Sequence, residues 1–155
     1  MQTLAKFRRL PPSDRRLLIE ASLLLLAARV ALRILPFKTI MGWTSRSRAL
    51  AAVDVVAART LVMRVRWAVQ AGARHGPGQT VCFPQAIAAH LLLSRRGAPS
   101  TIYYGVAKTA AGALEAHVWV RSGSLAVVGC AAAPRFTVMT TFPHGGAALP
   151  SHSVR

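Results

Sequence analysis

The sequence predicts an α+β domain in which N-terminal helices are followed by a cysteine-bearing helix that packs on a small antiparallel sheet. Up to Arg96 the apolar residues recur at helical spacing, whereas from Ile102 onward they alternate with a period of two. Proline and glycine residues separate these segments, and short turns between consecutive strands favour antiparallel pairing. At 155 residues the chain is long enough for one domain with a single core.

We divide the chain into an extension, one domain and a tail. Residues 1–10 form the N-terminal extension, and residues 11–142 form the single domain. Within that domain, residues 11–72 are the helical part and residues 80–142 carry the cysteine and the strands. Residues 143–155 are rich in Gly, Pro and Ser, which predicts a disordered tail.

The first helix is expected over residues 13 to about 35. Ser13 is the predicted N-cap, Asp14 favours the positive end of the helix dipole, and Pro36 stops the helix. Within residues 17–35 the longest uncharged run, residues 21–28, is far shorter than the roughly 18 apolar residues that a membrane span requires. We therefore expect a core helix, with a membrane-surface helix as the alternative, and no membrane span.

A second helix is expected over residues 47 to about 71, where apolar residues again recur at helical spacing. Residues 37–43 are the linker before it. Gly72 is predicted to close this helix, and residues 72–79, with further Gly and Pro, form a loop that leads to the cysteine.

The third helix places a cysteine at its N-terminus. It is expected over residues 83–96, because Pro84 lies in its first turn and Gly97 follows its last basic pair. A free thiol has a pKa of about 8.5 and is mostly protonated at neutral pH, but the unpaired N–H groups and the dipole at a helix N-terminus favour the thiolate. Cys82 is therefore the candidate nucleophile.

The chain after Pro99 is expected to form strands. They cover Ile102 to Val106, residues 113–121, residues 125–128 and residues 135–142, with turns at residues 109–112 and 122–123. In the second strand, alternation directs Leu114, Ala116, Val118 and Val120 to one face, and Glu115, His117 and Trp119 to the other. Helix-then-strand order would let His117 meet Cys82 across the core, so His117 is the candidate base.

The net charge indicates what kind of partner to expect, and the number of cysteines indicates the redox state of the compartment. Twenty basic and four acidic residues give a formal net charge of +16, which favours an acidic, phosphorylated or carboxylate-bearing partner. Binding to nucleic acid or to an anionic membrane would require basic residues on one face with aromatic residues between them, and the aromatic residues are dispersed. Two cysteines without a secretory leader indicate a reducing, cytoplasmic compartment.

Four linked sequence blocks stand out after the second helix. They are Cys82-Phe83-Pro84-Gln85-Ala86, Leu91-Leu92-Leu93-Ser94-Arg95-Arg96-Gly97-Ala98-Pro99, Tyr104-Gly105-Val106 and Glu115-Ala116-His117-Val118-Trp119-Val120. These blocks resemble the lasso-peptide leader peptidases, which are cysteine proteases with a transglutaminase-like, papain-like core. The similarity covers about residues 10 to 142 and includes the leucine-rich first helix that closes in Arg33-Ile34-Leu35-Pro36-Phe37.

The resemblance implies an activity and a set of partners. Cys82, activated by His117, would cut the precursor peptide between leader and core. A separate asparagine-synthetase-like cyclase would then use ATP on the free core, so this chain needs no cofactor and no metal. The chain looks like the split form of the family, because it begins directly with the helical segment. This implies a separate leader-recognition protein as partner.

One element of the family pattern is missing. The resemblance implies an Asp roughly a dozen residues after His117, but residues 125–130 contain no acid. Glu115 lies on the same strand face as His117, and a backbone carbonyl or an amide such as Gln85 could also orient the ring. The missing acid motivates an alternative function, a catalytically impaired homologue that acts as a scaffold for the precursor and the cyclase.

Overall fold

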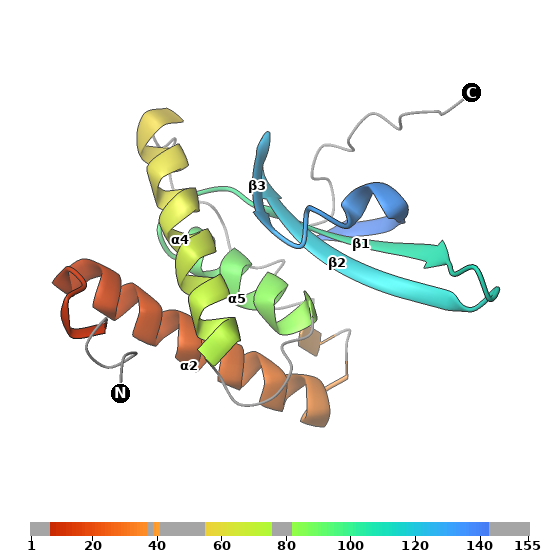
Figure 1. Ribbon diagram of the computed structural model, residues 1–155, viewed down its shortest axis with the longest axis horizontal. Coiled ribbons are helices and arrows are strands. Elements are labelled where there is room, and N and C mark those ends of the chain that lie inside the picture. The colour runs from red at the N-terminus through yellow and green to blue at the C-terminus, as the bar shows by residue number, and fades with distance from the viewer. Residues whose placement is uncertain (1–6, 37–38, 41–54, 76–81, 143–155) are drawn as a thin grey trace.

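The computed structural model describes residues 7–36, 39–40, 55–75 and 82–142. It has a layer of helices on a four-stranded antiparallel sheet (Figure 1), which confirms the predicted α+β architecture. The long helices of the described part are α2 (Pro12–Ile34), α4 (Val55–His75) and α5 (Cys82–Ser94). The strands are β1 (Thr101–Lys108), β2 (Leu114–Ser122), β3 (Leu125–Val128) and β4 (Thr137–Phe142), with the short 3₁₀ helix η1 (Ala133–Arg135) before β4.

Helix α5 is the centre of the fold. It lies between the other two helices and the sheet, and it packs on α2, on α4 and on β2. Nine of its residues are buried, because its sequence is apolar on every side and a helix of that kind is stable only when it is covered all round. The larger core therefore contains α5, the inner faces of α2 and α4, and one face of the sheet.

The sheet has the strand order β3-β2-β1-β4, and its two faces belong to different cores. The inner face carries Ile102, Val118 and Val120, which join the larger core. The outer face carries a second, smaller cluster around Tyr103, Trp119 and Phe136. This confirms the predicted alternation along β2.

Helix α2 begins one residue earlier than predicted, and Ser13 is not its cap. The N-cap position is Pro11, which makes no side-chain hydrogen bond, and Pro12 occupies the first turn. Asp14 instead accepts hydrogen bonds from Arg64 of α4 at 2.6 and 2.9 Å. The end of the helix before Pro36 agrees with the prediction.

The prediction that Gly72 closes the second helix is wrong, because α4 continues to His75. A Cβ atom at Gly72 would lie 3.1 Å from both Leu25 Cδ1 and Ser22 Oγ. The glycine therefore permits a close approach between α4 and α2, and it does not form a C-cap.

Helix α5 ends at Ser94, and the predicted glycine follows it. Gly97 has a φ of 76°, and the N–H of Ala98 donates to the Leu93 carbonyl at 3.0 Å, as in a Schellman motif. Arg95 and Arg96 form ion pairs with Glu20 of α2, the second at 2.5 Å. The basic pair at the end of this block thus connects two helices.

Some predicted segments lie wholly or largely outside the described residues: the linker 37–43, the start of the second helix at residue 47 and the tail 143–155. The loop predicted over residues 72–79 is wrong for residues 72–75, which belong to α4, and the rest of it lies outside the described residues. The last strand begins at Thr137 rather than at residue 135, because η1 occupies residues 133–135.

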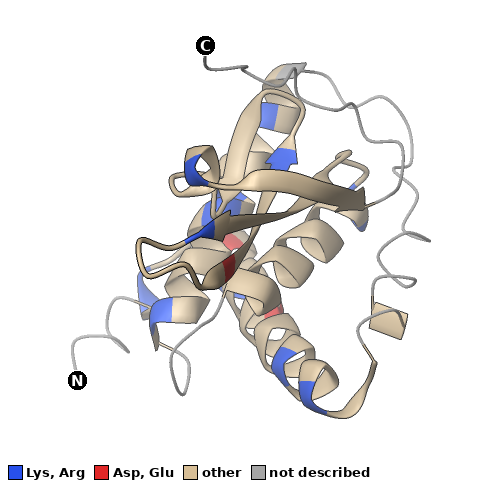
Figure 2. Ribbon diagram, turned by 90° about the vertical axis from the view of Figure 1, so that its right-hand side faces the viewer, with Lys and Arg blue, Asp and Glu red and all other residues tan. Residues whose placement is uncertain are grey.

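Among the described helices, none is both long and apolar enough to cross a membrane. Figure 2 shows Lys and Arg positions distributed over several elements.

Candidate active site

Cys82 is the first residue of α5, so the structure places its thiol at a helix N-terminus, as the sequence predicted. The thiol is free and half-buried, and it packs against the larger core. The next residue, Phe83, has its ring centroid 6.5 Å from that of Tyr104 on β1. This contact positions the first turn of α5 against the sheet.

His117 lies in the middle of β2, and its ring is held by a backbone carbonyl. Its Nε2 atom lies 2.8 Å from the carbonyl oxygen of Gly129. A carbonyl oxygen only accepts hydrogen bonds, so Nε2 is the protonated nitrogen of the neutral ring. The other ring nitrogen, Nδ1, then carries the lone pair that a general base requires.

Gly129 is a residue that the sequence prediction missed. It follows β3 directly, twelve positions after His117, in the segment where the resemblance implies an Asp. Its φ is 72°, and a Cβ atom there would lie 2.6 Å from the Val118 carbonyl oxygen. Only glycine fits this conformation and this approach, so the side-chain-free residue is what brings the carbonyl to the ring.

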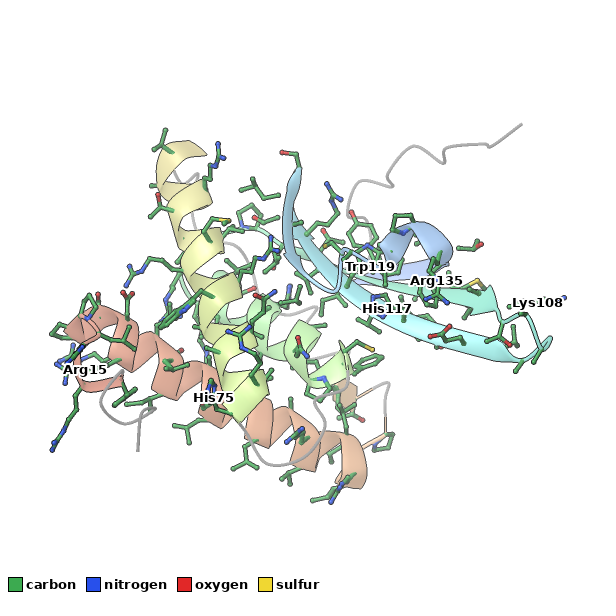
Figure 3. The ribbon with its side chains drawn as sticks, in the orientation of Figure 1. Arg15, His75, Lys108, His117, Trp119 and Arg135 are labelled. Atoms are coloured by element: carbon green, nitrogen blue, oxygen red, sulfur yellow. The ribbon has the colours of Figure 1, made fainter. Side chains whose placement is uncertain are left out.

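The His117 ring lies on the outer face of the sheet. It stacks on Trp119 with ring centroids 5.9 Å apart, and its centroid is 4.9 Å from that of Phe136. Figure 3 shows His117 and Trp119 close together on the sheet, with Arg135 beside them. This is the face of the smaller cluster, whereas Cys82 packs against the larger core.

The residue after Cys82 nevertheless contacts the strand that pairs with β2, one register position from His117. Tyr104, which contacts the ring of Phe83, pairs with Val118, and the next pair along the ladder joins Gly105 to His117. Among the residues that the structure describes, no hydrogen bond joins the Cys82 thiol to the His117 ring. The structure thus brings their elements together and directs the two side chains to different clusters.

Glu115, the acid that shares a strand face with His117, forms an ion pair with Arg135. The Arg135 Nη2 to Glu115 Oε2 distance is 3.2 Å, and both side chains are exposed. The Gly129 carbonyl, rather than this carboxylate, is the group that holds the His117 ring.

Cys130, the second thiol, differs from Cys82 in its surroundings. It donates to the Val120 carbonyl oxygen at 3.1 Å and packs against the outer cluster. Burial raises the pKa of the Cys130 thiol above its ordinary value, which favours the protonated and unreactive form. Its role is therefore to pack and to position the chain after β3.

Comparison with known proteins agrees with this architecture. The family model of the transglutaminase-like superfamily matches residues 22–141, which include α5, the strands β1 to β3, all but the last residue of β4, Cys82 and His117. A comparison with curated proteins gave no match, and a comparison with solved structures gave none. Because the family match covers most of the chain, with a cysteine at the start of a central helix and a histidine on the adjoining strand, the protein belongs to the transglutaminase-like superfamily.

Proposed function

We propose that this protein is a cysteine peptidase in which Cys82 is the nucleophile and His117 the general base. The observation that carries the proposal is the hydrogen bond from His117 Nε2 to the Gly129 carbonyl oxygen, at 2.8 Å, because it leaves Nδ1 as the basic nitrogen. Cys82 is also the first residue of a thirteen-residue helix, the end at which the backbone N–H groups have no partner within the helix. Membership of the transglutaminase-like superfamily supports the same chemistry.

The reaction is acyl transfer in two steps. The Cys82 sulfur adds to the peptide carbonyl while its proton passes to His117 Nδ1, and the imidazolium then protonates the leaving amine as the C–N bond breaks. Water, deprotonated by the same nitrogen, next attacks the thioester and restores the thiol. Gly129 orients the ring through a neutral carbonyl group. The neutral Asn side chain has the same role in Cys-His-Asn peptidases.

The substrate in this proposal is the precursor of a lasso peptide, cut between its leader and its core. The four sequence blocks from Cys82 to Val120 support this choice. The proposed partners are a separate leader-recognition protein, which presents the precursor, and an asparagine-synthetase-like cyclase, which uses ATP after the cut. The proposed location is the cytoplasm. No cofactor or metal enters the steps assigned to this chain.

The test is a reconstitution of the chain with the precursor and the leader-recognition protein. We expect Cys82→Ala to abolish cleavage, and Cys130→Ala to retain it because the second thiol only packs. Cleavage is followed by mass spectrometry, and circular dichroism confirms that both variants fold. Undiminished cleavage by Cys82→Ala would end the peptidase proposal.

One observation favours a second candidate, a catalytically impaired scaffold that binds the precursor and the cyclase. The His117 ring stacks on Trp119 and lies tilted against Phe136, on the sheet face opposite to α5. A peptide aldehyde with the sequence before the cleavage site separates the two candidates. A covalent adduct at Cys82 supports the peptidase, whereas binding of the precursor without adduct or turnover supports the scaffold.

A further inference from the structure

Helix α2 has two apolar faces, and only one of them is covered. Leu17, Ala21, Leu25 and Ala28 are buried against the rest of the domain. On the opposite side, five large aliphatic side chains are each at least 47% exposed: Ile19, Leu23, Leu26, Val30 and Ile34. We name this row the outer stripe of α2. A helix that is apolar on both sides is normally covered on both sides, so the outer stripe requires a partner.

The spacing of the outer stripe suits another helix. Its first four members follow one another at intervals of four, three and four residues, which is the seam of a coiled coil. From Ile19 to Ile34 the stripe is about 22 Å long at a rise of 1.5 Å per residue. It also contains no aromatic residue, although membrane-surface helices commonly place Trp or Phe on their apolar face. The pattern therefore favours a helix over a lipid surface.

The charges on α2 indicate what kind of partner helix would bind to the outer stripe. Arg15, Arg16 and Arg33 belong to the same helix as the outer stripe. The acidic residues that the structure describes are all paired with arginines: Asp14 with Arg64, Glu20 with Arg95 and Arg96, and Glu115 with Arg135. A second copy would carry the same formal net charge of +16, so self-association is opposed by repulsion between the two chains.

We propose that the outer stripe of α2 is a docking surface for a helix of a partner protein. That helix has an apolar seam that packs on Leu23, Leu26 and Val30, and it carries Asp or Glu at the flanking positions, where they face the arginines of α2. The surface lies on α2, and its use does not depend on Cys82 or His117.

The test uses the full chain and a synthetic four-heptad peptide with Leu at the seam positions and Glu at the flanking positions. Binding is measured by fluorescence anisotropy at physiological ionic strength. We expect the parent to bind, and Leu23→Glu and Val30→Glu each to weaken binding by about tenfold or more, because each inserts a charge into the apolar seam. Val56→Glu is the matched control, since Val56 is 72% exposed on another helix and the change in net charge is the same.

A peptide with Lys in place of Glu is expected to bind at least about tenfold more weakly. Failure of the Glu peptide to bind, or an equal loss in Val56→Glu, overturns the proposal. Two further measurements identify other occupants. Flotation with phosphatidylcholine–phosphatidylglycerol vesicles that is lost in Leu23→Glu would assign the stripe to a membrane, and a dimer in light scattering that is lost in Val30→Glu would assign it to a second copy. Because every variant retains Cys82 and His117, the precursor-cleavage assay reports the proposed activity separately.

Discussion

Substituting Gly129 by alanine tests whether its carbonyl holds His117. The new Cβ would meet the Val118 carbonyl oxygen at 2.6 Å, so the backbone must move. Alanine at a φ of 72° costs about 1–2 kcal/mol, and overpacking adds about 1–3 kcal/mol. The expected loss of unfolding free energy is therefore about 2–5 kcal/mol.

Gly123→Ala is the matched control for this substitution. Gly123 has a φ of 57°, and a Cβ there would meet nothing within 4 Å. It should therefore lose only the conformational part, about 1–2 kcal/mol. Urea unfolding measures both variants, with the slope of the transition checked for a change in the unfolded state. Equal losses in the two variants would refute the close approach at Gly129.

The cleavage assay measures a second property of Gly129→Ala, its activity. Displacing the carbonyl from His117 removes the group that fixes the tautomer, and triads with a wrong tautomer lose activity on the order of 10⁴-fold. We therefore expect Gly129→Ala to lose cleavage activity, when the assay is run under conditions in which this variant is still folded. Gly123→Ala should keep its cleavage activity. Full activity in a folded Gly129→Ala protein would show that the carbonyl has no part in orienting the ring.

Two further predictions concern ionisable groups. The ion pair with Arg96 lowers the pKa of Glu20, so this carboxylate stabilises the fold above the ordinary Glu value of about 4.3 and loses its effect as the pH falls through the lower folded value. Glu20→Gln should accordingly cost about 1 kcal/mol at pH 7, and urea unfolding should show that difference shrink below about pH 4. Because burial raises the pKa of Cys130, iodoacetamide at neutral pH should label Cys82 first, as peptide mass spectrometry can show. Faster labelling of Cys130 would contradict its assignment as a packing residue.

The periodicity of the sequence predicted the elements better than their ends. The change from helical to alternating spacing located α5 and the strands, and Pro84 and Gly97 marked the two ends of α5. The prediction for Gly72 was wrong because a glycine can either end a helix or permit close packing between two helices, and the sequence does not distinguish the two roles. Such contacts depend on a second element, which local sequence does not specify.

The candidate site was predictable in its side chains and not in its backbone. The helix signals placed Cys82, and alternation placed His117 on the same face as Trp119. The sequence did not specify which face α5 covers, because the outer face of β2 also carries a large apolar residue, Trp119. It could not identify the Gly129 carbonyl either, since every residue has a carbonyl group and only the fold selects one.

The register of the sheet restricts how Cys82 and His117 could meet. A slip of β2 by one residue would turn His117 to the inner face, but it would also move Val118 and Val120 out of the larger core. Because β2 is an inner strand, rotation of the His117 side chain alone does not carry the ring to the other face of the sheet. The peptidase proposal therefore requires that binding of the precursor and its partner protein changes the backbone of β2 locally at His117, whereas the scaffold proposal needs no such change.

The alkylation rate of Cys82 distinguishes these two cases. If the partner and precursor assemble the pair, His117→Ala should slow alkylation of Cys82 in the complex and leave the rate in the free chain nearly unchanged, because the base then acts only in the complex. Trp119→Phe, which keeps an aromatic ring on the outer face, is the control for indirect effects of packing. If Cys82 is alkylated at the same rate in the parent complex and in the His117→Ala complex, His117 does not activate the thiol in either state. The scaffold would then be the function that remains.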